Sequence, residues 1–177
     1  MLNIFNTGDD SRFSWDSMGN IAEGRKNLGE DMPVLMYRLF QYTLRSELTQ
    51  RLGEETVREI LRSAGALAGR EFAAHLLDLT LPLNEFLASL QNILEEQKIG
   101  ILRIEKFNAQ TGEAVLTIGE DLDCSGLPVT GNTVCNYDEG FLAGVFSEYT
   151  GKEYVVTEID CWGSGARVCR FQANISH

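Results

Sequence analysis

Three cysteines and one glutamate near the end of the chain have the residue types and spacing of a metal site. Cys161 and Cys169 flank a Gly-Ser-Gly turn, so in an antiparallel hairpin they would lie roughly opposite one another on one face. Cys135 stands at the expected start of a helix, where the helix dipole favours a thiolate. Glu158 precedes Cys161 by three residues and can join them only if the strand bulges or ends in between.

These four side chains would form a closed tetrahedral site of three thiolates and one carboxylate, which is typical of structural zinc. Cys124 is an alternative ligand. With it, four thiolates could hold either zinc or an iron-sulfur cluster. Free cysteines are also common as small buried hydrophobic residues. The spacing alone therefore leaves zinc, a cluster and plain packing open.

Composition restricts the partners and the location. The chain has 177 residues, of which 44% are hydrophobic, enough for one globular core. A net charge of -11 opposes binding to nucleic acid or to an anionic membrane. No apolar run approaches the roughly 20 residues of a membrane span, and no signal peptide begins the chain. We expect a soluble cytoplasmic domain, in which reductants keep cysteines as thiols or metal ligands.

Apolar periodicity predicts the order of helices and strands. We expect an irregular arm over 1–32, followed by a ligand-binding domain over 33–177. Helices are expected at 33–53, 54–77, 83–98 and 136–150, and hairpin strands at 100–107, 113–119, 152–160 and 167–175. Gly65 and Gly69, four residues apart, permit close helix packing. This order predicts an α+β fold with helices packed on an antiparallel sheet.

Two segments resemble the 4-vinyl reductase domain family. They are Cys135-Asn-Tyr-Asp-Glu-Gly-Phe-Leu-Ala-Gly and Glu158-Ile-Asp-Cys-Trp-Gly-Ser-Gly-Ala-Arg-Val-Cys-Arg-Phe, and the helical part extends the resemblance to about residues 33–173. The family is similar to the sensory domains of phenol-responsive activators and to transport-particle (TRAPP) and NO-signalling folds. The resemblance implies a zinc ion held by Cys135, Glu158, Cys161 and Cys169.

The resemblance also implies a ligand pocket between the sheet and the helices. Its expected lining is apolar and consists of Phe72, Phe86, Leu90, Ile104, Val145 and Phe146. The expected function is a zinc-containing sensor of a hydrophobic or aromatic small molecule, which forms a homodimer and signals through a separate protein. The alternatives are an accessory protein or reductase acting on the vinyl group of a tetrapyrrole, and an iron-sulfur redox or gas sensor. Because no dinucleotide fingerprint or evident hydride donor is present, we favour a binding module over an enzyme.

Overall fold

The computed structural model describes residues 13–108 and 110–176, which fall into two compact units that divide between Pro33 and Val34. The first unit contains a 3-10 helix, Trp15–Met18, and the short helix α1, Ile21–Gly24. The side chain of Asn20 caps α1 by accepting a hydrogen bond of 2.9 Å from the backbone N–H of Glu23. Phe5 of the predicted arm lies outside the described residues.

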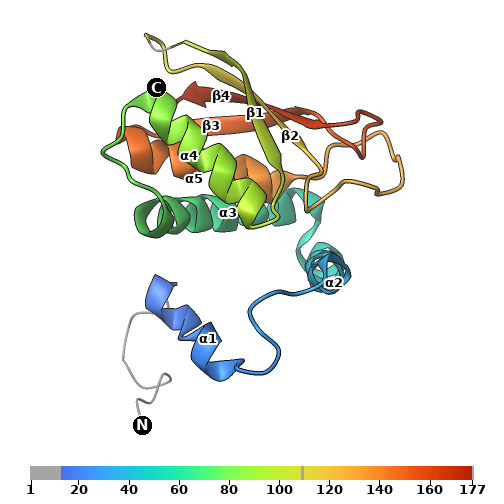
Figure 1. Cartoon of the computed structure of the whole chain (residues 1–177). Coiled ribbons are helices and arrows are strands. Elements are labelled where there is room, and N and C mark those ends of the chain that lie inside the picture. The colour runs from blue at the N-terminus through green and yellow to red at the C-terminus, as the bar shows by residue number, and fades with distance from the viewer. Residues whose placement is uncertain (1–12, 109, 177) are drawn as a thin grey trace. The chain divides into compact units, whose positions relative to one another are not determined.

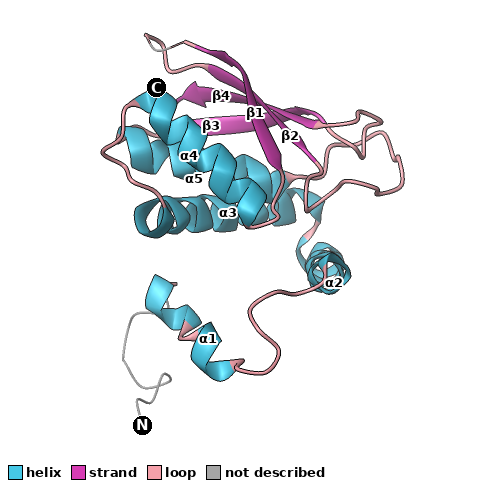
Figure 2. Ribbon diagram, viewed as in Figure 1, coloured by secondary structure: helices cyan, strands magenta, loops and turns pink. Residues whose placement is uncertain are grey.

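The second unit contains four helices and four strands, in the order that the sequence predicts. The helices are α2 Val34–Leu52, α3 Glu54–Leu76, α4 Leu83–Glu96 and α5 Asn136–Thr150, and the strands are β1 Ile101–Phe107, β2 Ala114–Gly119, β3 Tyr154–Asp160 and β4 Cys169–Ile175. All strand pairs are antiparallel, and the sheet order is β1-β2-β4-β3. The α3, α4 and α5 helices lie on one side of this sheet (Figures 1 and 2). The predicted α+β class is confirmed.

The core lies between that face of the sheet and the helices. Alternate residues of β3 are buried, as expected when one strand face meets a core and the other meets water. The aromatic rings of Phe86 and Tyr149 stack with centroids 3.8 Å apart, so α4 and α5 touch through side chains above the sheet. No helix within the described part of the chain has the length and apolar character needed to cross a membrane.

The α3 and α5 helices cross with their backbones in direct contact. A Cβ atom added at Gly65 or Gly69 would strike the carbonyl oxygen of Tyr137 or Phe141, and one added at Gly140 would strike that of Arg62. The close packing expected from the glycine spacing is therefore confirmed. This crossing fixes the start of α5, and with it the position of the cysteine that precedes the helix.

The α2 helix is oriented differently from an ordinary core helix. It buries none of its residues. Its apolar residues Leu35 and Phe40 are 75% and 67% exposed, whereas Tyr37, Arg38 and Gln41 form hydrogen bonds with the loop that follows β2. Polar bonds therefore attach α2 to the rest of this unit, and its apolar face is left uncovered within it.

Candidate metal centre

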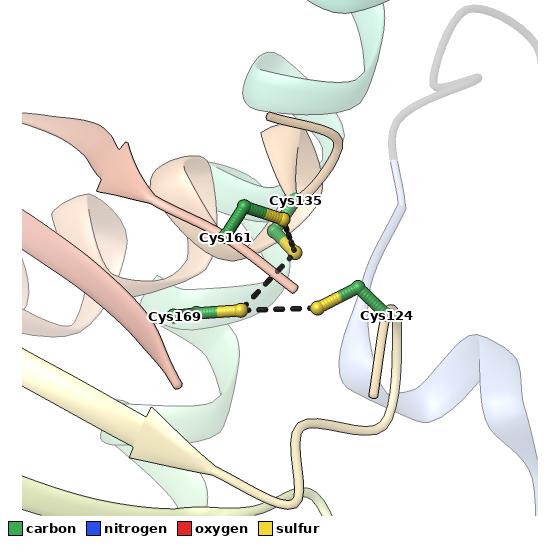
Figure 3. Close-up of side chains that lie close together, drawn as sticks. All are labelled: Cys124, Cys135, Cys161 and Cys169. Atoms are coloured by element: carbon green, nitrogen blue, oxygen red, sulfur yellow. Dashed lines mark hydrogen bonds between the residues drawn. The ribbon is translucent and has the colours of Figure 1, made fainter. Parts of the chain in front are cut away.

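Four cysteine side chains from four different parts of the second unit meet in one buried cluster (Figure 3). Cys124 comes from the loop after β2, Cys135 caps α5, Cys161 follows β3 and Cys169 begins β4. Their sulfur atoms all lie within 4.8 Å of one another, and no cysteine is more than 1% exposed. The Cys135 sulfur is 3.8 Å from that of Cys161 and 3.7 Å from that of Cys169, while Cys124 and Cys169 are 3.0 Å apart. Such a cluster could hold a metal ion.

The β3–β4 hairpin positions two of these cysteines. Its register shifts between Glu158 and Asp160, which is the irregularity that lets Glu158 and Cys161 both point inward despite their odd spacing. Beyond the strand, the backbone N–H of Cys161 donates to Ser164 Oγ at 3.0 Å, and the N–H of Ala166 donates to the carbonyl of Cys161 at 3.0 Å. These bonds close the turn tightly around the Cys161 sulfur.

Glu158 lies beside the sulfur cluster. Its Oε2 accepts a hydrogen bond of 3.0 Å from the backbone N–H of Cys135, but its buried Oε1 has no hydrogen-bond partner among the described residues. Burial, and then the neighbouring charge of Cys161, raise the pKa of Glu158 to about 8. One carboxylate oxygen thus helps to hold the start of α5, and the other is available to a proton or a cation.

Glu139 ties the helix crossing to this site, and the sequence analysis missed it. Its Oε1 accepts from the backbone N–H of Glu158 at 2.8 Å, and its Oε2 accepts from Arg62 Nε at 2.6 Å. The Asn136 amide donates to the same Oε2 at 3.2 Å. The buried carboxylate therefore joins α3, α5 and β3. An acidic residue in the first turn of an apolar helix was the only sequence signal, and such residues are also common on helix surfaces.

The loop that carries Cys124 is held by polar residues on both sides. Asp121 Oδ1 accepts from the backbone N–H groups of Asp123 and Cys124 at 2.9 and 3.0 Å. From α2, Tyr37 and Gln41 donate to the two carboxylate oxygens of Asp123 at 2.8 and 2.6 Å. The polar spacing of 37, 38, 41 and 42 along a helix could have indicated this attachment. Which loop these residues hold was not readable from the sequence.

Two loops cover the sulfur atoms from solvent. Trp162 Nε1 donates to the carbonyl of Leu127 at 3.0 Å, and the N–H groups of Thr130 and Gly131 donate to the carbonyl of Gly163 at 2.9 and 3.0 Å. The Arg167 guanidinium lies 5.3 Å from the centre of the Trp162 ring. The cluster is consequently enclosed, as a structural metal site is.

The close approach of the sulfur atoms perturbs their ionisation. Hydrogen bonds from Cys124 and then Cys135 lower the pKa of Cys161, while hydrogen bonding to Cys124 and to other cysteines of the cluster raises the pKa values of Cys135 and Cys169. One sulfur therefore carries the negative charge and its neighbours donate to it. A bound cation would allow the remaining thiols to lose their protons.

The residues expected to line a ligand pocket come together, but as a packed core. Five of them, Phe72, Phe86, Leu90, Val145 and Phe146, are buried, and Ile104 is partly buried against them. Surface hollows in the described part of the chain lie elsewhere; one, of about 640 Å³, is lined by residues such as Thr111 and Asn174 at the far end of the sheet.

Comparison with known proteins supports the predicted relationship. Residues 114–175 match the family model of the 4-vinyl reductase domain. An uncharacterised protein of Methanocaldococcus jannaschii is 28% identical over 150 residues, which are 85% of this chain and 80% of the relative. A second protein of the same organism is 34% identical over 86 residues, about half of each chain.

Solved structures share the fold at low sequence identity. A vinyl-4-reductase family protein from Methanocaldococcus jannaschii has a TM-score of 0.64 at 16% identity and covers 96% of this chain and 100% of its own. The phenol-responsive sensory domain of the transcription activator PoxR, solved with phenol, has a TM-score of 0.62 at 18% identity and covers 75% and 71%. A trafficking protein particle complex subunit 3 from Naegleria fowleri has a TM-score of 0.60 at 11% identity and covers 82% and 98%. The predicted resemblance is therefore confirmed, and the chain carries a 4-vinyl reductase domain over residues 114–175.

Proposed function

We propose that this protein is a small-molecule-binding sensor domain whose C-terminal half is held together by a structural zinc ion. The observation that carries the proposal is the meeting of four buried sulfur atoms from four separate segments. Four uncharged thiols gain little from such an arrangement, whereas a cation bound to thiolates contributes binding energy that is also folding energy.

The sulfur spacing fits a single tetrahedral ion. A zinc–sulfur bond is about 2.3 Å, so two thiolates of a tetrahedral site lie about 3.8 Å apart. The separations of Cys135 from Cys161 and from Cys169, 3.8 and 3.7 Å, match this value. Cys124 and Cys169, at 3.0 Å, would have to move apart by about 0.8 Å.

We propose Cys124, Cys135, Cys161 and Cys169 as the ligands. Glu158 then acts beside the ion through its hydrogen bond to the Cys135 backbone, in place of the direct ligation expected from the resemblance. Its unpartnered Oε1 keeps it an alternative to Cys124 as the fourth ligand. The two arrangements separate in a pair of variants: Cys124→Ser should lower zinc affinity strongly and Glu158→Gln only mildly if the thiolate is the ligand.

An iron-sulfur cluster fits this spacing less well. A cluster places iron and inorganic sulfide atoms between the thiolates, so its outermost sulfur atoms would be more widely spread than the ligands of one ion. Four sulfurs within 4.8 Å of one another favour a mononuclear site. A tetrahedral set of four sulfurs suits zinc among the common single ions.

The proposed ligand is a hydrophobic small molecule that enters between the sheet and the helices. The fold is shared with a sensory domain solved with phenol and with a trafficking subunit solved covalently bound to palmitic acid. The side chains that would surround the ligand are the apolar set of Phe72, Phe86, Leu90, Ile104, Val145 and Phe146. Since these side chains now pack together, binding requires α4 to move away from the sheet.

We further propose that the protein acts in the cytoplasm as a homodimer that passes its signal to another protein. Buried free thiols suit a reducing compartment. The exposed apolar residues of α2, among them Leu35 and Phe40, offer a surface for dimerisation.

Methyl-resolved NMR tests the ligand site directly. We expect titration with phenol or palmitate to shift the methyl signals of Leu90, Val145 and Ile104 and to leave those of Leu35 and Leu39 on α2 unchanged. Shifts confined to the α2 methyl groups would show that the ligand merely adheres to the exposed helix face. Either result leaves the metal proposal intact, because metal content is measured separately.

A further inference from the structure

A second group of metal-binding side chains lies against the cysteine cluster and shares one member with it. Ligating atoms of Asp121, Asp138 and Cys135 all lie within 4.8 Å of one another. Asp121 is 3% exposed and Asp138 is 8% exposed. Two carboxylates this close in a buried setting repel each other unless a proton or a cation lies between them.

Asp138 has no partner that would explain its burial. Its Oδ2 is out of contact with solvent and accepts no hydrogen bond from any described residue. Burial, and then the charges of Asp123 and Asp121, raise the pKa of Asp138 well above its ordinary value. A buried carboxylate in this state is either neutral or bound to a cation.

The basic residues nearby are engaged elsewhere. The Arg38 guanidinium donates to the backbone carbonyls of Leu122 and Ser125, at 2.8 Å each. Arg45 donates to the carbonyl of Val134 and to the side chain of Asn136, also at 2.8 Å. Neither arginine therefore forms an ion pair with Asp121 or Asp138.

The geometry of Asp121 suits a shared ion. Its Oδ1 holds the loop through two backbone N–H groups, which leaves Oδ2 for another ligand. The Cys135 sulfur lies 3.9 Å from Oδ1. A tetrahedral ion with bonds of about 2.3 Å to sulfur and 2.1 Å to oxygen would hold the two atoms about 3.6 Å apart.

We infer that Asp121, Asp138 and Cys135 form a second cation site, in which the Cys135 thiolate bridges a second divalent ion to the ion of the four-cysteine site. This inference rests on the proposed four-cysteine site. The donor set of two carboxylates and one shared thiolate suits a borderline divalent cation such as zinc, and it binds more weakly than four thiolates. A second positive charge offsets the excess negative charge of four thiolates around one divalent ion. The centre would then consist of two adjacent ions.

Cadmium is the probe of choice, because the 113Cd NMR chemical shift reports how many sulfur atoms surround the ion. We expect the reduced protein with excess 113Cd to give two resonances, one typical of four thiolates and one typical of mostly oxygen ligands with one sulfur. Asp138→Asn, which keeps the side-chain shape, should lose the second resonance and keep the first. Glu148→Gln removes the same charge from the other end of α5 and should keep both.

Each other outcome contradicts a defined part of the account. A single four-sulfur resonance in the wild-type protein, at any cadmium concentration, overturns the second site and leaves the first standing. Two resonances that persist in Asp138→Asn also overturn it, because the ion would then have other ligands. Absence of the four-sulfur resonance contradicts the proposed function itself. If Asp138→Asn fails to fold, the wild-type spectrum still decides.

Discussion

Replacement of Gly140 by alanine tests how the helix crossing positions the cysteine cluster. The added Cβ would strike the carbonyl oxygen of Arg62 and lie 2.8 Å from both the Arg62 carbonyl carbon and the Ala66 nitrogen. All three atoms belong to the α3 backbone, so no flexible side chain can move aside. The α3 and α5 helices must separate, and Cys135, five residues earlier, must shift with α5.

The magnitude follows from two opposing effects. Overpacking of a tight interior costs roughly 1–3 kcal/mol, and the upper end applies here because backbone meets backbone. Alanine gains about 1 kcal/mol over glycine within a helix. The net loss in the free energy of unfolding is therefore about 2 kcal/mol, or a Tm lower by roughly 4–8 °C for a chain of this size.

Denaturant and thermal unfolding of the zinc-loaded and chelated protein measure this loss. Gly24→Ala is the matched control, since it changes glycine to alanine in a helix where no atom lies within 4 Å of the new Cβ. We expect the control to unfold like the wild-type protein and Gly140→Ala also to bind zinc more weakly. If Gly140→Ala were as stable as the wild-type protein, the crossing would not be as tight as we describe.

Three further changes test other parts of the account. Cys161→Ala should release the metal and destabilise the β3–β4 hairpin, and an unchanged zinc content with unchanged melting would contradict the ligand assignment. Burial raises the pKa of Glu158 from 4.5 to about 8. Below about pH 4.5 its carboxyl group is protonated in both folded and unfolded forms, and above that value only the folded form keeps the proton; the metal-free protein should therefore lose stability as pH rises toward 8, by up to about 1.4 kcal/mol per pH unit. Glu158→Gln should lack that slope in chelated urea melts, and an equal slope would assign it to other groups. Tyr37→Phe removes the 2.8 Å hydrogen bond to Asp123; it should cost about 1–2 kcal/mol and speed metal loss to a competing chelator, whereas unchanged release would show that α2 does not hold the Cys124 loop.

The secondary structure was predictable because apolar periodicity is strong along most of this chain. The helix expected at 136–150 is α5 with the same bounds, and the two hairpins begin within two residues of their predicted starts. The order of the sheet was not predictable. Pairing of Ile118 with Cys169 joins β2 to β4, and a long-range contact of this kind leaves no periodic trace in either strand.

The candidate site was predictable only for the residues whose chemistry is rare. Cysteine is uncommon and its spacing is informative, so three of the four clustered sulfurs were assigned directly and Cys124 was the alternative. Asp121, Asp138 and Glu139 were missed because acidic residues usually lie on the surface, and 26 of them occur in this chain. Their burial is a tertiary property, created when α2, α3 and the loop after β2 close around them.

Elemental analysis with an absorption spectrum, on protein purified without oxygen and without a metal-affinity tag, tests the central claim most directly. We expect at least one zinc ion per chain to survive dialysis and no band in the visible range. Iron with inorganic sulfide and a visible band, or a metal-free protein whose four thiols react freely with an alkylating reagent, would contradict the proposed zinc centre.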